Sequence, residues 1–364
     1  MTELKMDDPT QWVVPTTADE LSAFVFSGRE LREYDLSGRD FAGAELGGGV
    51  FHQVDLRGSK LTGADLREAT LVECKLDGCD LAGANLHQTA IIDCGLAQVN
   101  LRGARMTGTK LSKVIAPGLD LRDTDQRISV FIDCDLRGAL LPGATLERTV
   151  FLRCEFAGAD FRGLRFEGVT LYEADLREVL LDGVEFERCA MIKTTLAGMK
   201  LTGMRAPHAQ FTDADLEGCD LSEADLRNAN FKGAKLGGAS LVNATANNAL
   251  FVEADLRGVD LRGAKLSQAI FIDANLEQAN CAGATMYQAI FHRAKCRQAT
   301  FVTANLIYAD FSQADLSGAD FSAAQMFRAK LHNVDDRDAL IPNRAVALGT
   351  DPELAAAENW RPEF

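Results

Sequence analysis

The sequence contains no apolar run long enough to cross a membrane, and it does not open with a basic segment followed by an apolar one. Its first residues instead include Asp7 and Asp8. These two absences predict a protein that is made and kept in the cytoplasm and has no membrane partner. Export by a dedicated machine that needs no signal peptide stays open.

Histidine is scarce, and no serine or cysteine has a recognisable histidine and acid partner that would make it a nucleophile. A metal site needs several ligands in one place, whereas the five histidines are spread along the chain. These absences predict a protein that is not an enzyme and holds no metal or cofactor. The histidines are His52, His87, His208, His292 and His332.

Positive charge is also in deficit, because 38 lysines and arginines face 53 aspartates and glutamates, for a net charge of −15. Residues 1–30 and 332–364 each carry −4, which leaves −7 for the long stretch between them. A net acidic surface repels phosphate at physiological salt. We therefore expect no direct binding to DNA or RNA.

What the sequence does have is a period of five. A large apolar residue occupies every fifth position from Leu31 to Leu331, and the residue two places before it is small. Neither a helix of period 3.6 nor a strand of period 2 keeps this phase. Two inward positions in each pentapeptide are therefore expected. The exceptions at the large position are Ala116, Gln126, Ala206, Ala246, Cys281 and Cys296.

A second period of 20 residues lies on top of the first. Phenylalanine recurs at this spacing, so that four pentapeptides make one turn of the chain. Such turns stack as parallel strands about 4.8 Å apart, which gives about 15 coils and requires both ends to be capped. The phenylalanines in phase are Phe131, Phe151, Phe211, Phe231, Phe251, Phe271, Phe291 and Phe311.

Segments such as Ala64-Asp65-Leu66-Arg67-Glu68 and Ala254-Asp255-Leu256-Arg257-Gly258 resemble the A(D/N)LxG signature of pentapeptide-repeat proteins. The resemblance covers about four fifths of the chain. It implies an all-β fold, the right-handed quadrilateral β-helix, with the large and small residues inside. It implies no particular activity, because members of the family do different things on the same rod.

Three regions are expected: an N-terminal cap at 1–30, the β-helix at 31–335 and a C-terminal tail at 336–364 with a short helix. Asp351, Pro352 and Glu353 are typical of a helix start. The apolar residues of the tail can pack on the last coils or on a second molecule. They are Leu340, Ile341, Val346, Leu348, Leu354, Trp360 and Phe364, and those of the cap are Trp12, Val13, Val14, Leu21, Phe24, Val25 and Phe26.

The nine cysteines all fall at inward positions, which predicts reduced, buried thiols that act as small hydrophobes. Cys74 with Cys94 and Cys134 with Cys154 are expected to be vertical neighbours within reach of a disulfide, but their side chains point the same way. Glycine closes most pentapeptides on two of the four sides, which predicts positive φ at two corners of each coil. Gln126 is either buried or part of a local bulge.

One side of the predicted coil differs from the other three, because apolar and β-branched residues occupy its outward positions. Strand propensity alone would scatter such residues over all four sides. Their concentration indicates a contact with a protein partner or a second copy, or a surface covered by a terminal segment. The residues are Val72, Ile92, Val130, Ile132, Val150, Leu152, Tyr172, Ile192, Leu250, Val252, Ile270, Ile272 and Ile290.

The sequence therefore predicts a non-enzymatic scaffold or adaptor that presents this side to a protein of unknown identity. A homodimer through the tail or through the same side is a further expectation. Some pentapeptide-repeat proteins accompany bacterial type VI toxin-delivery systems, and this architecture is similar. The alternative is a topoisomerase-binding protein, because family members that protect DNA gyrase present an acidic rod shaped like duplex DNA.

Overall fold

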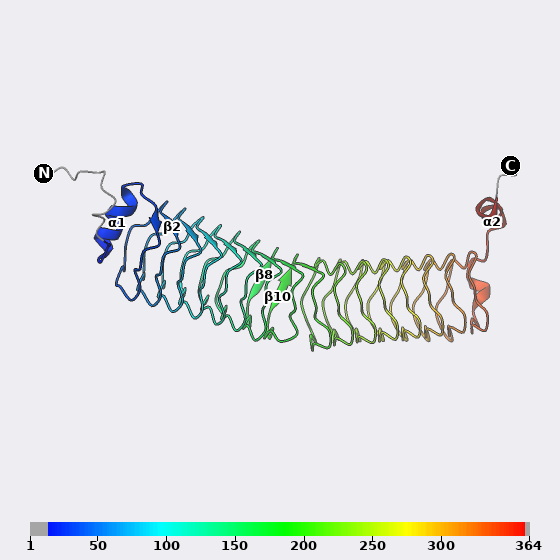
Figure 1. Cartoon of the computed structure of the whole chain (residues 1–364). Helices are drawn as coiled ribbons and strands as arrows, with labels where there is room; N and C mark the ends of the chain where they lie inside the picture. The colour runs from blue at the N-terminus through cyan, green and yellow to red at the C-terminus, as the bar shows by residue number, and fades with distance from the viewer. Residues whose placement is uncertain (1–13, 361–364) are drawn as a thin grey trace, which may run out of the picture. The chain divides into compact units, whose positions relative to one another are not determined.

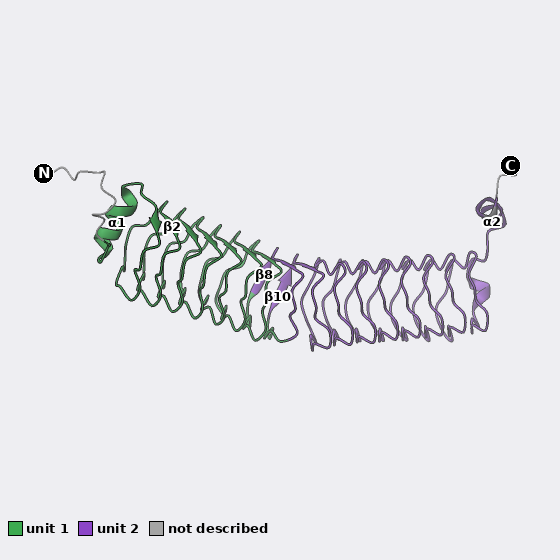
Figure 2. Cartoon of the chain, in the orientation of Figure 1, with its two compact units in different colours: residues 1–164, 178–183 green, residues 165–177, 184–364 purple. Residues whose placement is uncertain are grey.

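The computed structural model describes residues 14–360 (Figure 1). Trp12, Val13 and Phe364, which the sequence assigns to the cap and the tail, lie outside the described residues. The described chain forms two compact units (Figure 2). Unit 1 holds the chain up to residue 164 together with 178–183, and unit 2 holds 165–177 and the chain from 184 onward. The predicted boundaries at 30 and 335 remain a prediction.

Unit 1 opens with the helix α1 (Ala18–Phe26), which begins with a capping box between Thr17 and Glu20. Leu21 and Val25 are buried, so one face of the helix covers apolar surface. Phe26 was expected to help close the first coil, but 95% of it is exposed because it lies at the last turn of the helix, away from this buried face.

Seven parallel strands of unit 1 pair in sequence order. Each central residue lies opposite the residue 20 positions later, as Phe51 does with Leu71 and Phe131 with Phe151. Isolated bridges on the other sides keep the same spacing, for example Asp65 with Asn85. The predicted 20-residue coil is confirmed. The strands are β1 (Leu31–Arg32), β2 (Val50–His52), β3 (Thr70–Val72), β4 (Ala90–Ile92), β5 (Lys110–Ser112), β6 (Val130–Ile132) and β7 (Val150–Leu152).

In unit 2, β8 (Arg165–Glu167) pairs with β10 (Glu185–Glu187), and β9 (Thr170–Tyr172) pairs with β11 (Ala190–Ile192). Later coils are joined by isolated bridges at the same spacing, such as Leu250 with Ile270. A short 3-10 helix, η2 (Arg344–Val346), and the helix α2 (Pro352–Asn359) follow. Asp351 caps α2 by accepting from the amides of Glu353 and Leu354, which confirms the predicted helix start.

The large inward residues fill the core of both units. The six phenylalanines from Phe211 to Phe311 form a stack in unit 2, with ring centroids 4.5–5.0 Å apart and planes within 4° of parallel. Gln126 is also fully buried, which decides between the two expectations for it. Its Nε2 donates to Thr124 Oγ1 at 2.8 Å, whereas its Oε1 has no hydrogen-bond partner within residues 14–360.

The prediction of positive φ at only two corners is wrong. Four successive corners of one coil have φ values of 62°, 67°, 58° and 53°, at Gly58, Gly63, Glu68 and Glu73. The chain turns after every pentapeptide, and from Glu33 to Asp338 each closing residue except Glu178 lies in the left-handed region. A Cβ built on Gly58 or Gly63 meets no atom within 4 Å. Glycine therefore lowers the conformational cost of a corner, but the space there does not require it.

The cysteines are free and buried, as expected, but the view of them as simple small hydrophobes was incomplete. Cys79 Sγ donates to the carbonyl of Leu56 at 2.7 Å, which is 23 residues back on the preceding coil. Thr89 Oγ1 makes the equivalent bond to the carbonyl of Leu66 at 2.7 Å. The seven thiols at the small inward position therefore serve as hydrogen-bond donors inside the core. Burial raises the pKa of Cys79 to about 11, which keeps this donor protonated at neutral pH.

Candidate protein-interaction surface

Eleven of the thirteen apolar residues predicted for one side form two groups. The unit 1 patch consists of Val72, Ile92, Val130, Ile132, Val150 and Leu152, which lie on β3, β4, β6 and β7. The unit 2 patch consists of Leu250, Val252, Ile270, Ile272 and Ile290, where the coils are joined by isolated bridges. Tyr172 and Ile192 end β9 and β11 of unit 2. All of these side chains are half-buried.

The geometry of the unit 1 patch follows from strand pairing. Val130 lies opposite Val150, and Ile132 lies opposite Leu152. Because side chains alternate along a strand, these four point outward while Phe131 and Phe151 between them point into the core. Each outward side chain is covered on its flanks by the next coil, which explains its half-buried state. The outer ends form a continuous apolar surface over β6 and β7.

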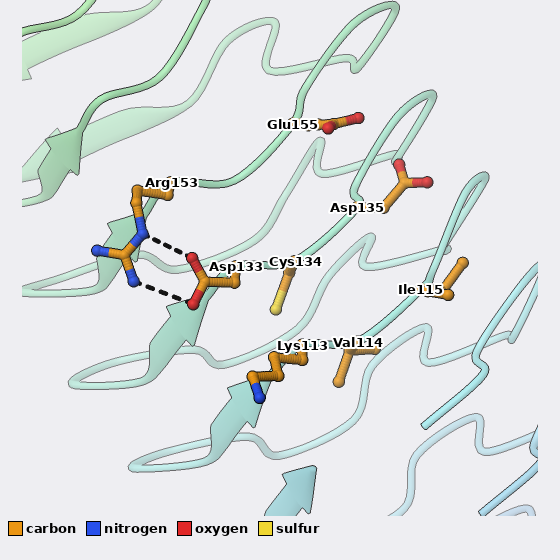
Figure 3. Close-up of a pocket in the computed structure, with 8 residues that line it drawn as sticks. All are labelled: Lys113, Val114, Ile115, Asp133, Cys134, Asp135, Arg153 and Glu155. Carbon is orange, nitrogen blue, oxygen red and sulfur yellow. Dashed lines mark hydrogen bonds and ion pairs between the residues drawn. The ribbon is translucent and has the colours of Figure 1, made fainter. Parts of the chain in front are cut away.

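A row of charged corner residues borders this patch (Figure 3). Lys113, Asp133 and Arg153 follow β5, β6 and β7 and share the left-handed corner conformation. Asp133 accepts hydrogen bonds from Arg153 Nε at 2.6 Å and Nη2 at 3.0 Å, across one coil. These bonds, helped by the charges of Arg153 and Lys113, hold the pKa of Asp133 below its ordinary value. Asp133 is therefore ionised at neutral pH.

A pocket of about 380 Å³ lies on the outer side of this row, toward Ile115, Asp135 and Glu155 (Figure 3). Its acids are matched by bases, because Asp135 pairs with Arg137 at 2.6 Å and Glu155 lies 3.6 Å from the same guanidinium. Opposite charges are thus interleaved around the pocket. Such a lining favours contact with a surface of mixed charge over the capture of one small ion.

Cys134 also lines this pocket, although its residue is only 1% exposed. Its Sγ donates to the carbonyls of Ile132 at 3.3 Å and Leu111 at 3.6 Å. A hydrogen bond from the thiol of Cys154 lowers the pKa of Cys134, and the same bond together with burial raises the pKa of Cys154. The two thiols titrate as a pair inside the wall of the coil.

Sequence reasoning missed Ile115, which is 62% exposed beside the unit 1 patch. It pairs with Asp135 in the column where Asp55 and Lys75 also stand. An isoleucine in a column of charged residues was the available signal. Ile115 therefore adds exposed apolar surface on the adjoining side of the coil, past the corner residue Lys113.

A second missed cluster lies in unit 2. Tyr287, Tyr308 and Phe327 are exposed, and their rings meet edge to face with centroids 6.0 and 5.9 Å apart. Tyr287 and Phe327 occupy outward positions on a different side of the coil from the unit 2 patch, and Tyr308 occupies a corner. The sequence signal was the aromatic residue at each of these positions.

The C-terminal helix is held by polar contacts. Glu358 accepts hydrogen bonds from Gln313 at 3.1 Å and Asn333 at 2.7 Å and lies 3.1 Å from His332 Nε2, while the amide of Asp351 donates to His332 Nδ1. These contacts lie beyond Ile290, the last residue of the unit 2 patch. The described part of the tail therefore docks on polar coils.

The tail residues predicted to pack on the last coils are largely exposed instead. Helix α2 attaches through the polar contacts above, which leaves the apolar side chains on its outer surface. Trp360 reaches 73% exposure. Packing on a second molecule remains a prediction for the exposed residues Leu340, Val346, Leu348, Leu354 and Trp360.

The acidic columns of the surface are paired with arginines of their own coil. Arg57 donates to Asp55 at 2.5 Å, and Arg127 donates to Asp125 at 2.6 Å, in each case two residues along the chain. Arginine bonds hold the pKa of both carboxyls below the ordinary value. Many carboxylates thus have their charge offset locally, which makes the surface less like the bare phosphates of DNA. The same motif recurs at Asp65, Asp120, Asp135, Asp160, Asp175, Asp225, Asp255, Asp260 and Asp335.

Two features are absent from residues 14–360. Within this range, no three side chains of histidine, cysteine, aspartate or glutamate gather as metal ligands would. No helix in the same range has the length and apolar character needed to cross a membrane.

The model of the pentapeptide-repeat family matches this sequence in eight segments that together span more than half of the chain. The chain belongs to the pentapeptide-repeat family. The matches leave out residues 170–208, where Val179, Val184, Met199 and Met204 occupy the small position of the repeat. The matched segments are 35–71, 50–88, 92–125, 129–169, 209–245, 236–272, 269–306 and 304–335.

Solved structures of pentapeptide-repeat proteins are similar to this one. A protein from the thylakoid lumen of Arabidopsis thaliana is 30% identical over 27% of this chain and 68% of its own, with a TM-score of 0.26. HetL from the cyanobacterium Nostoc, involved in heterocyst differentiation regulation, is 24% identical over 76% and 95%, with a TM-score of 0.22. QnrB1, a plasmid-mediated fluoroquinolone resistance protein, is 18% identical over 57% and 92%, with a TM-score of 0.30. A comparison with curated protein sequences gave no match.

Proposed function

We propose that this pentapeptide-repeat protein is a non-enzymatic scaffold or adaptor that binds a protein partner through the unit 1 patch. The observation that carries the proposal is the apolar surface over β6 and β7, where Val130, Ile132, Val150 and Leu152 point outward. Other sides of the same coils place aspartate and arginine at the equivalent positions, as at Asp125 and Arg127. Apolar residues grouped on one side of a charged protein are typical of a contact surface.

The surrounding charges support recognition of a protein. Lys113, Asp133 and Arg153 form a polar rim along one edge of the apolar surface, and Ile115 extends this surface beyond them. An apolar centre with a charged rim is the usual anatomy of a protein interface. The rim would set the register of the partner, while the apolar centre would supply most of the binding energy.

An adaptor for a bacterial toxin-delivery system of type VI is one role that this surface fits. A topoisomerase-binding DNA mimic is the alternative, and the net charge of −15 is the observation in its favour. The pairing of carboxylates with arginines weighs against mimicry. A gyrase supercoiling assay separates the two, since a mimic must change supercoiling activity and an adaptor must leave it unchanged.

The test of the main proposal is the double variant Val150→Asp with Leu152→Asp. Both side chains point away from the core, so the variant should unfold cooperatively near the wild-type temperature. A buried unpaired charge is costly at an interface, so the proteins captured by immobilised wild type should be lost.

Leu140→Asp is the matched control, because Leu140 is also a half-buried outward residue but lies on another side of the coil. This control should keep the captured proteins. Capture of the same proteins by the double variant and wild type would refute the proposal, and unfolding of the double variant alone would show that its patch is part of the core.

A further inference from the structure

The rim of the unit 1 patch is complementary to itself in reverse order at β6 and β7. The corner residues after β3, β4, β5, β6 and β7 are Glu73, Asp93, Lys113, Asp133 and Arg153. Asp133 and Arg153 flank the midpoint between β6 and β7 and carry opposite charges. When the order of the coils is reversed about this midpoint, each of these two charges meets its opposite.

The apolar positions share this midpoint. Val130 and Val150 are equivalent about it, and so are Ile132 and Leu152. A second copy turned end over end, about an axis parallel to the strands, presents its coils in the opposite order. Val130 then faces Val150 of the copy, and Ile132 faces Leu152. Asp133 at the rim faces the Arg153 of the copy.

We infer that the unit 1 patch binds a second copy of this chain, in an antiparallel dimer centred between β6 and β7. The inference rests on the proposed function, because it names the partner of the same patch. A closed two-fold contact uses one patch on both subunits, and the patch must therefore be complementary to itself. Both the charge order and the apolar residues meet this condition.

The contact is physically compatible with two stacked sheets. Sheets that pack face to face lie about 10 Å apart, and the outward valine, isoleucine and leucine side chains fill that space. Asp133 and Arg153 already form an ion pair within each subunit. In the dimer the two pairs would join into a group of four alternating charges around the axis. Such groups give orientation, since a parallel arrangement reverses the strands of the copy and would move its Arg153 to the opposite strand edge, away from Asp133.

A partner of uniform charge fits this rim less well. An acidic surface would be attracted by Lys113 and Arg153 but repelled by Asp93 and Asp133, and a basic surface would meet the reverse. The alternation of sign at successive coils therefore favours a partner with the same repeat spacing. A second copy of this chain supplies that spacing.

The test uses two charge reversals, Asp133→Arg and Arg153→Asp, studied alone and together. Either variant alone places like charges opposite each other in the dimer, so each should raise the dissociation constant about tenfold or more. An equimolar mixture of the two variants restores an acid opposite a base and should dimerise again. The mixture cannot repair the ion pair within a subunit, so recovery reports the contact between copies.

The measurement is the mass in solution by sedimentation, over a range of protein and salt concentrations. Wild type should approach twice 39.4 kDa, each reversal should stay near 39.4 kDa, and the mixture should return to the larger mass. A chain carrying both reversals is the control for folding and should also dimerise. Melting followed by circular dichroism checks that each variant is folded.

Several results would overturn the inference: a wild type that stays monomeric, single reversals that still dimerise, or a mixture that stays monomeric. A dimer that survives Val150→Asp with Leu152→Asp but is lost with Leu354→Asp and Trp360→Asp would place the contact in the tail. The proposed function is judged separately, by capture. If wild type is monomeric and the double variant Val150→Asp, Leu152→Asp loses the captured proteins, the partner is a different protein and the second copy is rejected.

Discussion

In unit 1 the side that carries the apolar patch is a hydrogen-bonded sheet in which β2 to β7 have three residues each, whereas beyond β11 in unit 2 the same side is joined by isolated bridges. The small inward residue after this side also differs. It is cysteine or valine in most coils of unit 1, as at Cys74 and Val114, and alanine from Ala214 to Ala314 in unit 2.

The small residue changes how the corner is hydrogen-bonded. In unit 2 the amide of Ala234 donates to the carbonyl of Phe231 at 3.0 Å, which closes a tight turn. In unit 1 the amide of Cys74 donates to the Sγ of Cys94 at 3.3 Å, and Cys94 Sγ donates to the carbonyl of Ile92 at 3.2 Å. A larger residue with a soft donor accompanies the more open corner and longer strand. The size of the small residue alone does not determine strand length, since the three-residue strand β9 is followed by Ala174.

The same pentapeptide repeat therefore forms two kinds of side in this chain, a sheet of short strands and a series of isolated bridges. Where alanine occupies the small position in unit 2, the phenylalanines stack nearly flat, with Phe231 and Phe251 within 3° of parallel. In unit 1, Phe131 and Phe151 are tilted by 23°, and Phe156 meets Phe151 edge to face. Unit 1 gains a sheet that can present outward apolar side chains, and unit 2 gains a more regular core.

The largest expected effect is the loss of stability when a core phenylalanine is removed from either unit. Phe251→Ala removes a ring held between Phe231 and Phe271, and a change of this kind in a packed core costs about 3–5 kcal/mol in the free energy of unfolding. Phe151→Ala is the matched variant in unit 1. Denaturant titration should show a strong loss in both. An unchanged midpoint for Phe251→Ala would mean that the ring is not part of a packed column.

An intermediate effect is expected at Gln126, the buried amide of unit 1. Gln126→Leu removes the unpaired Oε1 at similar volume, so the free energy of unfolding should rise by about 1–3 kcal/mol. Leu226 is the buried equivalent in unit 2, and Leu226→Gln should lower stability. Both changes are read by chemical denaturation. A loss of stability in Gln126→Leu would indicate that the amide has a partner in solution.

The smallest effect concerns the surface ion pairs, which occur in both units. Hydrogen bonds from Arg127 and Arg227 lower the pKa of Asp125 and Asp225 below 3.8. A carboxyl with a lowered folded pKa contributes stability above its unfolded pKa and loses it as the pH falls through the folded value. Arg127→Gln and Arg227→Gln should therefore lower the melting temperature slightly at pH 7 and leave it unchanged near pH 2. An equal deficit at both pH values would argue against this linkage.

Much of the fold could be predicted, because the repeat assigns each residue to a side and a depth. The burial of Phe251, the 20-residue pairing of Phe51 with Leu71 and the cap at Asp351 all follow from spacing and local chemistry. The corner conformation was mispredicted because glycine counts report the cost of positive φ and not its occurrence, as Glu73 shows.

The candidate site was predictable only in outline. The outward direction of Ile132 follows from its number, whereas the exposure of Ile115 depends on how the neighbouring coils leave it uncovered. The bidentate pairing of Arg153 with Asp133 depends on side-chain conformations that spacing does not specify. The tail was ambiguous for a similar reason: contacts of Glu358 with Asn333 and His332 involve residues far apart in the sequence.

The central claim is that the unit 1 patch recognises protein. The most direct test measures which proteins are captured by the double variant Val150→Asp, Leu152→Asp. The double variant Ile270→Asp, Ile272→Asp is measured beside it. The second pair makes the same chemical change in the unit 2 patch. We predict that both variants unfold cooperatively and that only the unit 1 variant loses the partners of wild type, a second copy included. Retention of every partner and of the wild-type mass by the unit 1 variant would contradict the account.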